Sequence, residues 1–91
     1  MNENTMLQMV KIDLGINTTI YDSRLLQYIE AAKEAITIEG ITLGDTVSDG
    51  NLVVMYAAWL WDKRKTGEGM PRSLRWMLNN RLFSEKVQSN G

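Results

Sequence analysis

The sequence predicts an all-α protein, a compact bundle of about four helices with short loops and a flexible C-terminal tail. Apolar residues recur at intervals of three and four in successive segments, which is the spacing of one helix face. Glycines and the single proline stand between these segments, at positions where they end or begin helices. Alternation of apolar and polar residues, which is typical of strands, never lasts more than a few positions.

The length allows one domain. A chain of 91 residues with 44% hydrophobic content is enough for a single modest core, and it leaves no room for a second one. We therefore expect one helical domain over residues 1–91, with an ordered core over residues 5–83. The last eight residues, SEKVQSNG, are mostly small or polar and are expected to form a fraying tail over residues 84–91.

The first two helices are predicted from capping residues and an apolar stripe. Asn4 or Thr5 suits the cap of a short helix that runs to Leu14, where a glycine follows. Asp22 suits the cap of a second helix through about Glu39, because its carboxylate complements the positive helix end. Steps of 4, 3 and 4 place four residues of this helix on one face: Leu25, Ile29, Ala32 and Ile36.

The third helix is expected to be the central one. It follows a predicted loop over residues 41–50, begins at a cap formed by Ser48 or Asp49, and runs to about Lys65. Its middle turns are apolar nearly all round, which indicates a helix covered by neighbours on most sides. Pro71 suits the first turn of a fourth helix, whose inner face is predicted to contain Leu74, Met77 or Leu78, and Arg81 or Leu82.

The composition argues against an enzyme. The chain has no cysteine and no histidine, so disulfides, thiolate metal sites and the usual zinc sites are excluded. The available carboxylate pair, Glu30 and Glu34, lies on a polar helix face, where we expect solvated surface rather than acid-base chemistry. We therefore predict no enzymatic activity, no cofactor and no metal site.

The sequence also predicts a soluble, unsecreted protein without a membrane partner. Its first residues lack the basic and apolar regions of a secretory signal. No window approaches the roughly 20 consecutive apolar residues that span a bilayer.

Charge is distributed unevenly along the chain. Residues 1–62 contain three basic and nine acidic side chains, a net charge of −6, whereas residues 63–81 contain six basic and one acidic side chain, a net charge of +5. Such a distribution favours association with a polyanion or with the acidic face of another copy of the chain.

The tryptophans lie close to this basic segment. Trp59 is predicted to belong to the core, because it shares a helix face with Tyr56. Trp61 and Trp76 are predicted to be exposed in an isolated subunit, and tryptophan beside arginine is enriched in protein interfaces. At least one of them is therefore expected to complete an intermolecular contact.

Three segments together resemble a known family, the small head-tail connector (adaptor or head-completion) proteins of tailed bacteriophages and prophages. LQMVKIDLGINTTIYDSRLLQYIEAAKEAI is similar to the family's opening, with a turn after a short helix and a paired-alanine step at Ala31-Ala32. AAWLWDKR resembles the end of its central helix, with Trp61 three residues before Arg64. MPRSLRWMLNNRL resembles its last helix, which closes with an arginine, here Arg81.

The resemblance implies a structural protein of the virion that forms a ring on the portal vertex and joins the DNA-filled head to the tail or a stopper protein. The implied partners are other copies of the chain, the portal protein, the tail-completion or stopper protein and, without sequence specificity, the DNA in the channel. Assembly would take place in the host cytoplasm. The candidate subunit or portal interface comprises Trp61, Lys63, Arg64, Arg72, Arg75 and Trp76, and we expect the four basic residues to meet acidic residues of the first two helices of a neighbour.

Two alternatives remain open from the residues alone. The basic fourth helix suits a small DNA-binding regulator, although apolar residues occupy the middle of that helix where a DNA reader presents polar side chains. The second alternative is a helical partner-binding module that does not belong to a virus.

Overall fold

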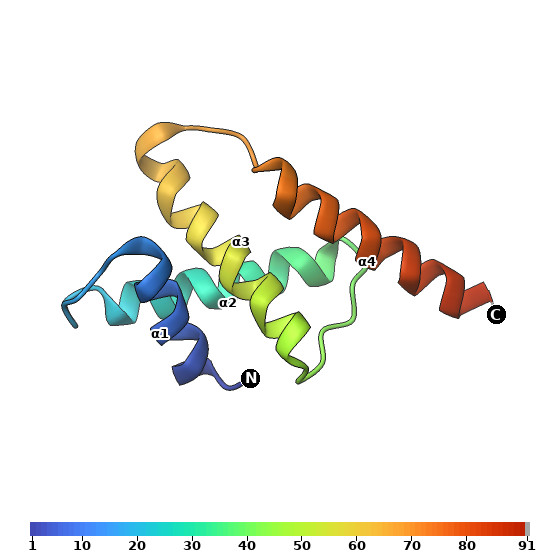
Figure 1. Cartoon of the computed structure of the whole chain (residues 1–91), viewed down its shortest axis with the longest axis horizontal. Coiled ribbons are helices and arrows are strands. Elements are labelled where there is room, and N and C mark those ends of the chain that lie inside the picture. The colour runs from blue at the N-terminus through green and yellow to red at the C-terminus, as the bar shows by residue number, and fades with distance from the viewer. Residues whose placement is uncertain (91) are drawn as a thin grey trace.

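The computed structural model describes the backbone of residues 1–90 and the side chains of residues 1–87. Four helices make up this part of the chain: α1 (Glu3–Leu14), α2 (Asp22–Ile38), α3 (Val47–Thr66) and α4 (Arg72–Asn90) (Figure 1). Short loops join them, and the described residues contain no strand. The predicted all-α fold with about four helices is confirmed.

The third helix lies at the centre of the fold, as predicted. α3 packs against α1, α2 and α4, and Figure 1 shows it crossing between them. Its buried side chains point in several directions because neighbours cover it on most sides: Leu52, Val53, Val54, Tyr56, Ala57 and Trp61.

The predicted stripe of α2 is confirmed, since all four of its residues are fully buried. Asp22 begins the helix but does not cap it through its side chain. Instead its carboxylate forms an ion pair of 2.9 Å with Lys11, a largely buried lysine of α1. The pair fixes the start of α2 against the end of α1, and it explains why a residue well suited to capping is used elsewhere.

Two predicted caps were wrong by two or three residues. The side chain of Asn2, rather than Asn4 or Thr5, accepts a hydrogen bond from the Thr5 amide (2.8 Å) and caps α1. Gly15 ends α1 in the left-handed conformation, as expected (φ +69°).

At the start of α3, the hydroxyl of Thr46 accepts the hydrogen bond from the Asp49 amide (3.1 Å). Thr46 is therefore the cap, and neither Ser48 nor Asp49 is. Residues 47–50, which were expected to belong to the loop, already form the first turn of the helix.

The fourth helix is longer than expected. It buries Leu74 and Leu78 against the core, and Leu82, which is partly buried against the core, lies beside Gly40 just after α2. The backbone then remains helical through Asn90, so residues 84–90 of the expected tail continue α4, which reaches beyond the other helices (Figure 1). Residue 91 of that tail lies outside the described residues, and the tail's flexibility stays a prediction.

Leu78 provides a test of how strongly α4 depends on the core. The substitution Leu78→Ala removes a fully buried side chain and is expected to lower the free energy of unfolding by about 3 kcal/mol, through lost burial and the cavity left behind. Urea unfolding followed by circular dichroism measures this loss. The exposed neighbour Asn79 supplies the control, because Asn79→Ala should change stability by less than about 0.5 kcal/mol. Equal losses in both variants would contradict the packing described above.

Candidate functional site

The six residues predicted for subunit or portal contacts lie on either side of the loop that joins α3 to α4. Three stand in the last turns of α3 and three in the first turns of α4. The structure divides them into side chains that are held by the chain itself and side chains that are left facing solvent.

Trp61 is held inside the chain. Only 7% of its surface is exposed, because Tyr21 and Tyr28 pack edge-on against the indole with ring centroids 5.5 and 5.7 Å away. The guanidinium of Arg64 stacks over the same indole at 3.8 Å. The prediction that Trp61 is exposed was therefore wrong, since the first turns of α2 cover it.

Trp59 differs from its prediction in the opposite direction, because it is half-buried rather than fully buried in the core. Its ring contacts Tyr56 edge-on at 5.4 Å, and the ammonium of Lys63 lies 4.7 Å from its ring centroid. The indole N–H donates a hydrogen bond to the carbonyl of Glu68 (3.3 Å). Trp59 thus joins the end of α3 to the loop that follows, and Lys63 is engaged within the same chain.

The start of α4 combines one internal contact with two free side chains. Arg75 forms an ion pair of 2.9 Å with Glu39, at the end of α2 in the same chain. Trp76 is 67% exposed, as predicted. Arg72 is exposed, and within residues 1–87 it has no ion pair. Of the predicted interface residues, Arg72 and Trp76 are therefore the two that face solvent without a partner within residues 1–87.

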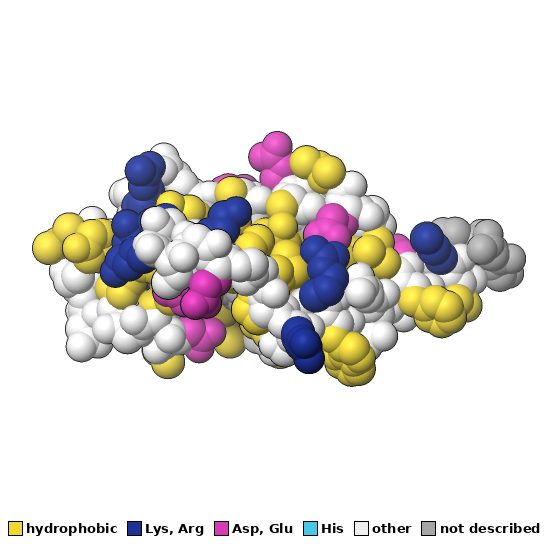
Figure 2. Space-filling view, turned by 90° about the horizontal axis from the view of Figure 1, so that it is seen from above, with side chains coloured by type: hydrophobic (Ala, Val, Ile, Leu, Met, Phe, Trp, Pro, Cys, Tyr) yellow, Lys and Arg dark blue, Asp and Glu magenta, His cyan; other side chains and the backbone are white. Residues whose placement is uncertain are grey.

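Sequence reasoning missed two further exposed apolar residues on α4. Phe83 is 70% exposed and Val87 is more than half exposed, and they follow Trp76 by 7 and 11 positions. This spacing places all three on one side of the helix, and we call them the α4 stripe. Figure 2 shows hydrophobic and basic side chains interspersed over the right half of the molecule, where α4 ends. The spacing was visible in the sequence, but Val87 falls within the expected tail over residues 84–91, so the stripe was not predicted.

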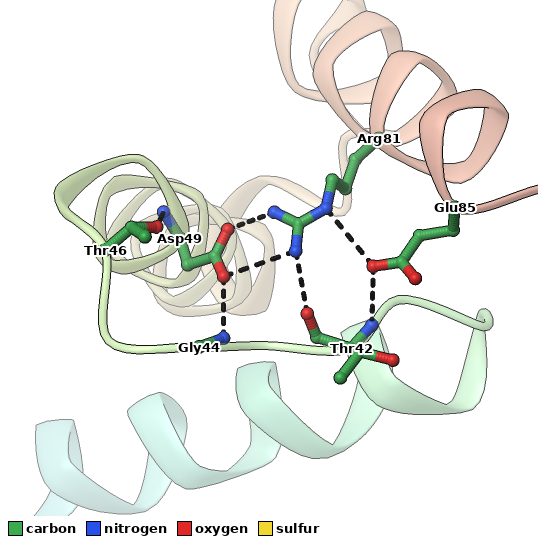
Figure 3. A network of polar contacts seen from close by, with 6 residues as sticks. All are labelled: Thr42, Gly44, Thr46, Asp49, Arg81 and Glu85. Carbon is green, nitrogen blue, oxygen red and sulfur yellow. Dashed lines mark hydrogen bonds and ion pairs between the residues drawn. The ribbon is translucent and has the colours of Figure 1, made fainter. Parts of the chain in front are cut away.

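Sequence reasoning also missed the contact that fixes α4. Arg81 binds the carboxylate of Asp49 through two nitrogens and donates to the carbonyl of Thr42 (2.7 Å) (Figure 3). The amide of Gly44 donates to Asp49 (2.6 Å), while Glu85 accepts from Arg81 (3.3 Å) and from the Thr42 amide (3.1 Å). We call these five residues the Arg81 network. It connects α4, the first turn of α3 and the loop between α2 and α3.

Electrostatics make this network strong. Asp49 is only 3% exposed, and burial by itself raises the pKa of its carboxyl. The hydrogen bonds from Arg81 and Gly44 outweigh this effect and hold that pKa below its ordinary value. In turn the hydrogen bond to Asp49 raises the pKa of Arg81. Both groups are therefore charged at neutral pH, and each satisfies the other.

Within the described residues, no helix is both long and apolar enough to cross a membrane. The same part of the chain contains no cluster of three or more carboxylates suited to a metal ion.

Comparison with known protein families identifies a match over most of the chain. Residues 4–89 match a family model described as phage gp6-like head-tail connector protein. The matched range includes nearly all of the four helices. No curated protein and no solved structure matches the chain.

The Arg81 network is tested by removing its cation. The substitution Arg81→Met leaves the Asp49 carboxylate buried without a counterion, and we expect the free energy of unfolding to fall by about 2 to 3 kcal/mol. Arg75→Met is the matched control, because the Arg75–Glu39 pair is more exposed and its loss should cost less than about 1 kcal/mol. Similar urea midpoints for the two variants would show that the Arg81 network contributes no more stability than the more exposed Arg75–Glu39 pair.

The same network predicts a dependence on pH. Because the pKa of Asp49 is lowered in the folded state, its contribution to stability is complete above the ordinary value of about 4 and is lost as the pH falls through the folded value. Wild type should therefore exceed Asp49→Asn in stability at pH 7, and the difference should shrink below about pH 4. Urea unfolding from pH 7 to pH 2 measures it, and a difference that stays constant would contradict the assignment.

Proposed function

The chain belongs to the family of phage gp6-like head-tail connector proteins, and we propose that it assembles as a ring on the portal vertex and joins the DNA-filled head to the tail or a stopper protein. Its partners in this proposal are other copies of itself, the portal protein and the protein on the tail side. The DNA that passes through the ring is contacted without sequence specificity.

The observation that carries the proposal is the extent of the family match. It covers residues 4–89, from the first turn of α1 to the last turn of α4. The likeness therefore concerns the complete helical arrangement rather than one short motif.

The surface of the chain is consistent with a ring. A ring needs two different patches on each subunit, one of which meets the other patch on the next subunit. Exposed apolar and basic side chains lie on α4, whereas the exposed carboxylates of α2 include Glu30 and Glu34. We do not assign Arg64 or Arg75 to the contact, because each is engaged inside its own chain.

The alternative of a DNA-binding regulator has less support. A helix that reads DNA presents polar side chains to the bases, whereas the outer side of α4 presents Trp76 and Phe83. Arg75, one of the basic residues such a reader would use, is paired with Glu39.

The proposal is tested by adding purified protein to portal-bearing heads that lack it. We expect a discrete high-mass ring, detected by sedimentation velocity with isolated portal assemblies, and restored attachment of tails to the heads. DNA binding should be weak. A regulator that makes several phosphate contacts would instead bind DNA tightly and lose roughly 10³-fold in affinity between 50 and 200 mM salt. Tight DNA binding together with no binding to portal assemblies would overturn the proposal.

A further inference from the structure

The outer side of α4 presents an apolar surface that the fold itself does not use. Leu74 and Leu78 bury the inner side of the helix, and the α4 stripe lies on the opposite side. Trp76, Phe83 and Val87 extend along about 16 Å of helix, at 1.5 Å per residue. Aligned, exposed apolar side chains of this size indicate a contact surface.

Cationic side chains border the stripe. Arg72 stands one turn before Trp76, and Lys86 stands between Phe83 and Val87, with both cations exposed. A partner for this surface therefore has to offer apolar area together with carboxylates.

Such a surface exists on the same chain, on the outer side of α2. Glu30, Glu34 and Ile38 follow one another at intervals of four, so they lie along one side of the helix over about 12 Å. They border a shallow groove of about 380 Å³, together with Lys33 and Thr37. Glu30 is paired with Lys33 (3.4 Å), whereas Glu34 has no ion pair within residues 1–87, and Ile38 is exposed. We call this surface the α2 groove.

We propose that the N-terminal part of the α4 stripe of one copy docks in the α2 groove of a second copy, with Trp76 against Ile38 and Arg72 paired with Glu34. In this register Phe83 and Val87 extend beyond the end of α2. The inference rests on the proposed ring and names its contact surfaces. A chain does not fill its own groove, because the Arg81 network and the Arg75–Glu39 pair hold its α4 with the stripe facing outward. Since stripe and groove are different surfaces, each copy has one of each, and the contact repeats from copy to copy.

Opposite charges at the contact permit a two-component test. Arg72→Glu and Glu34→Arg should each weaken self-association about tenfold or more, because each variant alone sets like charges against one another. An equimolar mixture of the two variants should assemble again, since each contact between two different variants joins opposite charges. Lys65→Glu, a reversal of another exposed cation, is the control and should assemble like wild type.

The apolar part of the contact is tested separately. Trp76→Ala should weaken self-association about 30-fold, as expected for an interface hot spot. Ile12→Ala removes another exposed apolar side chain, from α1, and should have no effect. Sedimentation velocity, with and without portal assemblies, measures association, and circular dichroism verifies that each variant keeps its helices.

The outcomes separate this inference from the function on which it rests. If the single variants assemble normally, or if the mixture does not recover assembly, the docking of the α4 stripe is overturned. Portal binding by the same variants would still support the connector function. Normal self-association with lost portal binding would assign the stripe to the portal and also overturn the docking. Wild type that assembles neither alone nor with portal assemblies would remove the proposed function and this inference together.

Discussion

The ion pair between Arg81 and Asp49 is the constraint on which the position of α4 depends. α4 follows a loop with two glycines and contributes only a narrow inner face to the core, so apolar burial alone leaves its direction weakly determined. A buried carboxylate is unfavourable unless a cation and hydrogen bonds satisfy it. Asp49 meets that requirement only when α4 brings Arg81 to the first turn of α3, and the same arginine then holds the carbonyl of Thr42 (Figure 3).

Because the inner face of α4 is fixed in this way, the same side chains always form its outer face. The loop between α2 and α3 is held by the same contacts, through the amides of Thr42 and Gly44. In the proposed ring, every copy has to present its contact surfaces in the same orientation, and a helix that is fixed against one end of α3 satisfies this. At the other end of α3, the aromatic contacts of Trp61 with Tyr21 and Tyr28 hold the start of α2.

Several residues show why part of the structure escaped prediction. Asp22 and Asp49 both precede or begin helices, and local capping chemistry assigned each to a cap. In the fold, Asp22 pairs with Lys11 and Asp49 with Arg81, residues 11 and 32 positions away. The predicted burial of the two tryptophans of α3, Trp59 and Trp61, was reversed for a related reason. Helical periodicity places them on different faces, but which face is covered depends on where α2 lies, and the chain pattern does not contain that information.

The sequence by itself determined the helices, because intervals of three and four between apolar residues and the glycine and proline breaks are local properties of the chain. It also determined which residues form the inner stripe of α2 and that α3 is central. Only the tertiary structure decided which cations are free. Arg64, Arg72 and Arg75 are alike in the sequence. In the fold, Arg64 stacks on Trp61 and Arg75 pairs with Glu39, whereas Arg72 has no ion pair within residues 1–87. The physical reason is that a charge is satisfied or left free by the groups that distant segments bring within contact distance, and sequence spacing does not specify those groups.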